Sequence, residues 1–225
     1  MAGTGYFTKD TFQFLRDLNA NNDRDWFARN KSRYEEALKA PALRLIEDFG
    51  KELPRLSSHF LSTPRSLFRI HRDTRFSKDK APYKTQAGVH FRHELSTTAH
   101  APGYYLHIEP GAVFLGIGIW RPESPALKEI REHIAASPAD WKAASRARRF
   151  TETFQLEGDA LKRPPKGFDA DHPLVEDLKR KDFIGVAHVA DSFATTADLP
   201  EQLVRKYETG SPFMRFLCKA LGVPF

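Results

Sequence analysis

The sequence has little of what marks several large classes of protein. It contains one cysteine in 225 residues, which excludes an internal disulfide framework and a cysteine-based zinc cluster and favours a reducing compartment. No apolar run reaches the roughly 18 residues of a membrane span. The first residues lack the basic stretch and apolar core of a signal peptide, so we expect a cytoplasmic protein without a membrane partner.

Motifs for nucleotide binding and for nucleophilic catalysis are also missing. There is no Walker loop and no Gly-x-Ser-x-Gly elbow, and the pair Gly116 and Gly118 lacks the third glycine of a dinucleotide fingerprint. The single cysteine, Cys218, stands among apolar residues and is interpreted as a packing residue. We therefore predict no cofactor.

The chain does have a substantial apolar content and a localised charge. It is 40% hydrophobic with 18 phenylalanines, too apolar for a disordered protein. Its net charge is +6, and residues 65–93 alone hold eight cations against two anions, an excess equal to that of the whole chain. Such a concentrated field favours an anionic ligand or partner.

Helices are expected at both ends of the chain. Thr8 and Asp23 can cap the first two helices, and Pro41 suits the first turn of a third. Later helices are predicted by apolar spacing and by prolines at their starts. Their expected ranges are 125–136, 138–148, 173–181, 199–208 and 212–221.

The middle of the chain shows the short, branched or alternating segments of β-strands. Pro110-Gly111 is a strong turn signal between two of them and predicts an antiparallel hairpin. The predicted strands are 67–71, 85–92, 104–109, 112–120, 150–156 and 183–190. The sequence therefore predicts an α+β fold, with a largely antiparallel sheet, helices packed on it, and one domain over residues 1–225.

The second strand of that hairpin carries a trough on one face. Phe114, Gly116, Gly118 and Trp120 alternate with branched aliphatic residues, so they share a face of the sheet. Two interpretations stand: a helix packs closely over the glycines, or a flat ligand lies there.

The most unusual stretch is a basic segment, residues 69–84, with cations at nearly every third position and two aspartates among them. We expect Asp73 to form a bidentate pair with Arg69 or Arg75, and Asp79 to hold a lysine or a backbone turn. Phe76 and Tyr83 are interpreted as apolar anchors.

Three functions are open for this basic segment. It can be a structural clasp whose arginines pair with carboxylates such as Glu35, Glu36 or Asp48, an anion-binding or catalytic site, or a nucleic-acid surface. In the second case arginine would stabilise negative charge and aspartate would act as a base. The candidate catalytic residues are Arg72, Asp73 and Tyr83.

The candidate ligand-binding residues of the basic segment are all cations and extend to its ends. They are Arg69, Arg75, Lys78, Lys80 and Lys84. A second basic loop, 161–168, adds Lys162 and Arg163 if it folds over the first and lines one cleft with it; otherwise it is an exposed, solvated loop.

Nine histidines raise the question of a metal site. His71 and His107 can meet if their strands are neighbours, and Glu109 lies on the same face as His107, which would give two histidines and a carboxylate. Chance assembly from nine histidines is easy, so we predict no metal ligands.

The motifs resemble one known family. Arg-x-x-Arg-Asp-x-Arg-Phe at 69–76, Asn21-Asn22 before Trp26-Phe27, Pro102-Gly103-Tyr104-Tyr105, and the run 161–168 are similar to domain of unknown function 2461, found in bacteria and fungi. The resemblance covers about residues 7–220. It implies one domain and directs attention to the basic segment, but it implies no activity.

The sequence thus favours a protein with an anion-recognising basic cleft for a phosphate or carboxylate ligand, with enzymatic activity undecided. The alternatives are a nucleic-acid-binding module, and a non-catalytic interaction protein in which the basic segment is a clasp. The oligomeric state is not predicted.

Overall fold

A six-stranded antiparallel sheet forms the centre of the fold. The computed structural model describes residues 5–96 and 102–225. The strands follow the spatial order β1-β2-β3-β4-β6-β5, and each neighbouring pair is antiparallel. Their bounds are β1 (Phe60–Leu61), β2 (Ala87–His93), β3 (Gly103–Ile108), β4 (Phe114–Ile119), β5 (Gln155–Glu157) and β6 (Phe183–His188).

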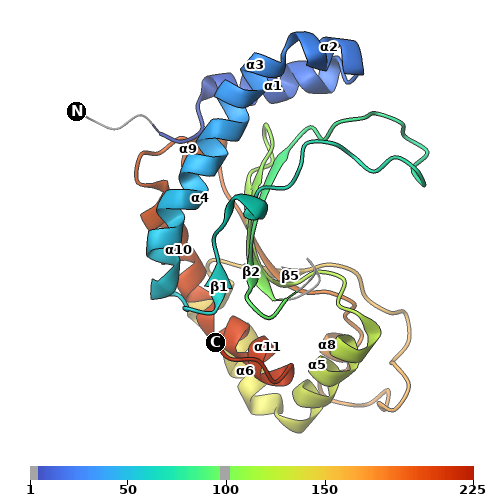
Figure 1. The fold of residues 1–225 in the computed structure, drawn as a ribbon. Helices are drawn as coiled ribbons and strands as arrows, with labels where there is room; N and C mark the ends of the chain where they lie inside the picture. The colour runs from blue at the N-terminus through green and yellow to red at the C-terminus, as the bar shows by residue number, and fades with distance from the viewer. Residues whose placement is uncertain (1–4, 97–101) are drawn as a thin grey trace.

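Helices precede, interrupt and follow the strands, so the fold class is α+β as the sequence predicts (Figure 1). The longer ones are α1 (Lys9–Ala20), α4 (Ala40–Glu52), α5 (Ser124–Ala136), α6 (Pro138–Ser145), α10 (Leu199–Thr209) and α11 (Ser211–Ala220). The shorter ones are α2 (Arg24–Arg29), α3 (Lys31–Tyr34), α7 (Arg148–Thr151), α8 (Val175–Leu178) and α9 (Asp191–Ala194). One π-helical turn and two 3-10 turns are η1 (Glu35–Lys39), η2 (Leu53–Arg55) and η3 (Pro64–Ser66).

The helix starts near the N-terminus follow from their capping residues. The Thr8 hydroxyl accepts a hydrogen bond from the backbone N–H of Asp10 as part of a capping box at α1. The Asp23 carboxylate accepts one from the N–H of Trp26 at α2, at 2.8 Å. Both predicted caps are confirmed.

One face of the sheet packs against helices from both ends of the chain. Phe91 of β2 lies against Phe49 of α4, with ring centroids 4.5 Å apart, and Tyr104 of β3 lies 4.9 Å from Tyr207 of α10. The Tyr207 hydroxyl donates to the carbonyl of Tyr105 at 2.7 Å. Figure 1 shows α4 and α10 side by side along this face.

Three expected elements differ in the structure. Residues 67–71 form only isolated bridges, at Leu67 and at His71, before the chain leaves the sheet. The expected strand at 150–156 is mostly a turn of helix, because Phe150 and Phe154 are both buried at helical spacing, and only β5 remains extended. The expected helix at 173–181 shortens to α8.

Across residues 5–96 and 102–225, no helix combines the length and the apolar character needed to cross a bilayer.

We predict that the chain unfolds in one cooperative transition, as a single domain over residues 1–225. The buried side chains from Phe7 to Cys218 belong to one hydrophobic cluster, so helices from both ends lose their packing together. Urea denaturation followed by far-UV circular dichroism and by tryptophan fluorescence should give coincident curves. Two separated transitions would show instead that the chain divides into independent units.

Candidate functional site

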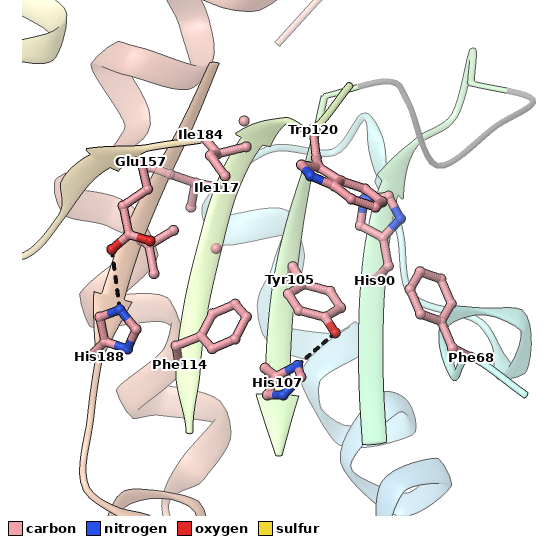
Figure 2. Close-up of a pocket in the computed structure, with 14 residues that line it drawn as sticks. Phe68, His90, Tyr105, His107, Phe114, Ile117, Trp120, Glu157, Ile184 and His188 are labelled. Atoms are coloured by element: carbon pink, nitrogen blue, oxygen red, sulfur yellow. Dashed lines mark hydrogen bonds and ion pairs between the residues drawn. The ribbon is translucent and has the colours of Figure 1, made fainter. Parts of the chain in front are cut away.

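The face of the sheet opposite the helices carries a cavity of about 410 Å³. Its lining comes from five strands and is mostly aromatic, aliphatic or glycine, with three histidines and one carboxylate among them (Figure 2). The lining residues are Phe68, His90, Gly103, Tyr105, His107, Phe114, Gly116, Ile117, Gly118, Trp120, Glu157, Ile184, Val186 and His188. We call this face the cavity face.

Strand alternation places these side chains together. Tyr105 pairs with His90 on one side and with Gly116 on the other, and Gly116 pairs with Val186. Cross-strand partners share a face of the sheet. A row of residues from four strands therefore forms the floor of the cavity.

The glycines of β4 form the trough that the sequence predicts on one face of this strand. Gly116 and Gly118 both line the cavity. Because the nearest neighbour of Gly116 is Tyr105 of β3, the interpretation that a helix packs closely over the glycines is wrong for Gly116. A Cβ atom at Gly118 would lie 3.0 Å from the Phe213 ring of α11, so a helix does pack close to that glycine. A Cβ atom at Gly116 would stand 3.4 Å from Cβ of Tyr105, an ordinary contact, so a larger residue there would fill the cavity rather than break the strand. At Gly118 the φ of +107° itself requires glycine.

Three polar side chains of β3 and its end form a hydrogen-bonded chain. Tyr105, His107 and Glu109 stand two residues apart on the cavity face. The Tyr105 hydroxyl lies 3.0 Å from Nδ1 of His107, and Nε2 of His107 lies 3.0 Å from a carboxylate oxygen of Glu109. Because the carboxylate can only accept, Nε2 carries the proton and Nδ1 accepts from the tyrosine.

Burial sets the ionisation of this chain. The His107 side chain is 11% exposed, and its ring stacks on Phe114 at 4.4 Å. Its burial lowers the pKa of His107 despite the nearby Glu109 carboxylate, which opposes the effect. Burial also raises the pKa of the Tyr105 phenol, and Glu109 adds to the rise. At rest the tyrosine and the histidine are therefore both neutral.

The other two histidines of the cavity lie to either side of the chain. Nδ1 of His90 is buried and has no hydrogen-bond partner among residues 5–96 and 102–225, and burial lowers the pKa of His90 to about 4. On the far side, Nε2 of His188 lies 3.2 Å from a carboxylate oxygen of Glu157, and both side chains line the cavity (Figure 2).

The basic segment forms a long arm that projects from the sheet beyond β2 (Figure 1). Asp73 and Arg75 form the expected bidentate pair, with nitrogen–oxygen distances of 3.0 and 2.7 Å. This hydrogen bonding lowers the pKa of Asp73 to about 2. Asp79 accepts from the N–H of Ala81 and from the Arg72 guanidinium.

The aromatic residues of the arm have different surroundings. Tyr83 is 6% exposed and stacks on Phe27 of α2 at 4.0 Å, so it is an anchor as expected. Phe76 is 95% exposed, and its interpretation as an anchor is wrong. The Phe76 ring does have one charged neighbour, the Arg75 guanidinium, which lies 5.8 Å from the ring centre.

Two of the arm's arginines are paired with carboxylates within the arm, as in a clasp. Arg72 and Arg75 each have their own carboxylate, and the Lys80 ammonium donates to the carbonyl of Thr74. The clasp partners expected outside the arm are wrong: Glu35 pairs with Lys39, Asp48 pairs with Lys51, and Glu36 accepts from Ser32. Lys78 is exposed.

Lys84, at the base of the arm, contacts a residue that lines the cavity. The Lys84 ammonium is 5.3 Å from the ring centre of Phe68, which lines the cavity, and it donates to the carbonyl of Arg69. Partial burial, and then the charge of Arg69, lowers the pKa of Lys84. Within the described residues, no ion pair involves either side chain.

The second basic loop lies away from the arm. Figure 1 shows the arm at one end of the sheet and the loop around residues 161–168 at the other, beside α5 and α8. Lys162 and Arg163 are exposed. The geometry therefore favours the exposed loop over a shared cleft.

A metal site of two histidines and a carboxylate is not formed. His107 does contact Glu109, but His71 lies beside Tyr83, with ring centroids 5.2 Å apart. In the part of the chain that the structure describes, no three histidine, cysteine, aspartate or glutamate side chains group closely enough to hold a metal ion.

Sequence reasoning missed most of the cavity. Tyr105, His90, His188 and Glu157 were not among the candidate residues. The alternation of Tyr105, His107 and Glu109 within one predicted strand was the signal that could have found the hydrogen-bonded chain. No local signal connects β2 with β5 and β6.

Comparison with known proteins identifies a family. Residues 10–216 match the family model described as "Conserved hypothetical protein (DUF2461)". No curated protein matches the chain.

We predict that the free energy of unfolding falls as pH decreases from about 6.5 to about 4. The pKa of His90 is about 4 in the folded protein and 6.5 ordinarily. As the pH falls, the unfolded chain therefore takes up a proton on His90 before the folded chain does, and this shifts the equilibrium toward the unfolded state. The difference corresponds to about 3 kcal/mol. Urea denaturation of the wild type and His90→Gln at pH 7 and pH 4 measures it, since the variant should lose less stability. Equal losses would contradict the assignment.

We also predict that Asp79→Asn loosens the arm. The amide can still accept from the N–H of Ala81, but it no longer carries the charge that pairs with Arg72. Limited trypsin digestion followed by mass spectrometry should then show several-fold faster cleavage after Arg75, Lys78 and Lys80. Cleavage after Lys166 in the second basic loop is the control. An unchanged pattern would mean that this pair does not hold the arm.

Proposed function

The chain belongs to the DUF2461 family, whose description names no activity, and we propose from its geometry that it binds a flat, largely apolar small molecule with one anionic or acidic end. The observation that carries this proposal is the cavity on the cavity face. At about 410 Å³ it falls within the usual range of small-molecule sites, roughly 300–1,000 Å³.

The shape and lining of the cavity support a planar ligand. Gly116 lowers the floor between the rings of Tyr105 and Phe114, and Ile184 and Val186 extend it as an apolar surface. Aromatic rings gain by stacking on such a floor. A sugar or another highly hydroxylated ligand would leave most of its polar groups without partners there.

The polar groups support an acidic end directed toward β2. The Lys84 ammonium stands at the Phe68 edge, and Arg69 lies close enough to lower the pKa of Lys84. Of the cations that the sequence suggests as anion ligands, this proposal keeps Lys84 and Arg69. Arg72, Asp73 and Tyr83 as catalytic residues, and Arg75, Lys78, Lys80, Lys162 and Arg163 as ligands, are left with less support, since their surroundings are local pairs, packing or solvent.

Nucleic-acid binding by the arm is the second candidate, and the exposed ring of Phe76 beside Arg75 favours it. A stacking ring next to cations is the arrangement that single-stranded nucleic acids use. Its mark would be affinity for an oligonucleotide that falls steeply with salt and is lost in Phe76→Ala.

We predict that naphthalene-2-carboxylate binds in the cavity and that two substitutions weaken it differently. Gly116→Val should weaken both this probe and its methyl ester about tenfold or more, because the new side chain occupies the floor. Lys84→Gln should weaken the carboxylate about tenfold and leave the ester unchanged, because only the anion gains a charged hydrogen bond. Ligand-detected NMR titration measures both affinities.

Lys128→Gln is the matched control for charge, since Lys128 is on α5 outside the cavity. Circular dichroism verifies that Gly116→Val keeps its fold. Equal affinity of the wild type and Gly116→Val for both probes would exclude the cavity as the binding site.

A further inference from the structure

The hydrogen-bonded chain on β3 connects the cavity to solvent. Tyr105 and the buried His107 both line the cavity, and the Glu109 side chain is 37% exposed. The hydroxyl, the imidazole and the carboxylate follow one another at 3.0 Å per step. A proton can therefore be passed between the cavity and the surface without any side chain leaving its place.

The groups at the two ends of this hydrogen-bonded chain set which atoms donate and which accept. Glu109 can only accept, so His107 presents the lone pair of Nδ1 to the tyrosine and the Tyr105 proton points at it. The phenolic oxygen keeps its own lone pairs for a group in the cavity. The same order of hydroxyl, imidazole and carboxylate activates a hydroxyl oxygen in hydrolytic triads.

We propose that Tyr105, His107 and Glu109 form an acid–base relay in which the Tyr105 oxygen removes a proton from the bound molecule. This rests on the proposed function and names the class of ligand more closely: a planar compound with an acidic O–H group, or with a C–H group beside a carbonyl.

The proton balance of the step is complete. The ligand's O–H or C–H bond breaks, its proton bonds to the Tyr105 oxygen, and the electron pair stays on the ligand, which becomes an anion. The original hydroxyl proton passes to Nδ1 of His107, which becomes an imidazolium beside the Glu109 carboxylate. No oxidant, reductant or co-reactant is needed.

Neighbouring charges stabilise both products of this transfer. The imidazolium lies 3.0 Å from Glu109, and its ring stacks on Phe114. The ligand anion forms at the end of the cavity where the Lys84 ammonium stands beside Phe68. Tyr105 is the group that touches the ligand, so it is the catalytic residue, and Glu109 acts through His107 as a positioning residue.

Naphthalene-2-sulfonyl fluoride tests the relay without a known substrate. The Tyr105 oxygen attacks its sulfur, fluoride leaves, and the hydroxyl proton passes to His107, which gives a stable aryl sulfonate ester. Mass spectrometry of peptides then reports the labelling rate of each tyrosine. We expect Tyr105 to react at least about tenfold faster in the wild type than in His107→Gln or Glu109→Gln.

The pH profile separates activation from mere packing. In the wild type the labelling rate of Tyr105 should rise as His107 loses its proton, whereas in His107→Gln it should rise only where the phenol itself ionises. Glu94→Gln is the matched control, because Glu94 pairs with His59 at 2.6 Å outside the cavity. Other tyrosines of the same molecule serve as internal references. If His107→Gln does not fold, Glu109→Gln carries the comparison.

The two proposals fail in distinguishable ways. Labelling of Tyr105 that is equally fast in the wild type and in Glu109→Gln, with the same pH profile, overturns the relay even if naphthalene-2-carboxylate binds. Labelling that depends on His107 and Glu109 supports the relay even if the carboxylate does not bind, in which case the ligand class of the proposed function is wrong. Absence of Tyr105 labelling in a wild type that binds the carboxylate also overturns the relay.

Discussion

Successive side chains of a strand point to opposite faces of its sheet, and here the helices from both ends of the chain pack on one of them. Phe91 and Tyr104 face α4 and α10, so their neighbours His90 and Tyr105 must face the other way. The apolar core thereby fixes which residues line the cavity. A shift of one residue in the register would turn the histidines toward the helices and the aromatic core toward the cavity face.

This constraint also explains the unusual ionisation in the cavity. Imidazoles that lie on a largely apolar floor lose hydration, and the pKa values of His90 and His107 fall, for His107 despite the opposing effect of the Glu109 carboxylate. Neutral histidine is the form that can accept a proton.

The sequence allowed much of the fold to be predicted because its signals are local. Thr8 and Asp23 cap helices, and Pro110-Gly111 turns the β3–β4 hairpin, all within a few residues. The expected strand at 150–156 failed for a local reason too, since Phe150 and Phe154 fit both periods in so short a run. The cavity was missed because its lining comes from β2, β5 and β6 as well as from the hairpin. These strands are brought into one sheet by contacts between residues distant in the chain, such as that between Glu157 and His188.

The outer part of the basic segment and its base are held by different contacts. Its outer part pairs Asp73 with Arg75 and Asp79 with Arg72, which neutralises charge and holds a shape. Its base is fixed differently. The Asn22 side chain accepts from the N–H of Tyr83 and donates to the carbonyl of Tyr83, at 3.0 and 2.9 Å.

Lys84 follows directly after Tyr83, the residue that Asn22 and the Phe27 ring hold in place. A lysine on a mobile loop would lose side-chain and backbone entropy on meeting an anion, whereas one attached to an anchored backbone loses less. Under the proposed function, the clasp therefore supports the site. The paired charges and the Asn22 contacts hold the arm, and the arm carries the Lys84 ammonium that lies beside Phe68.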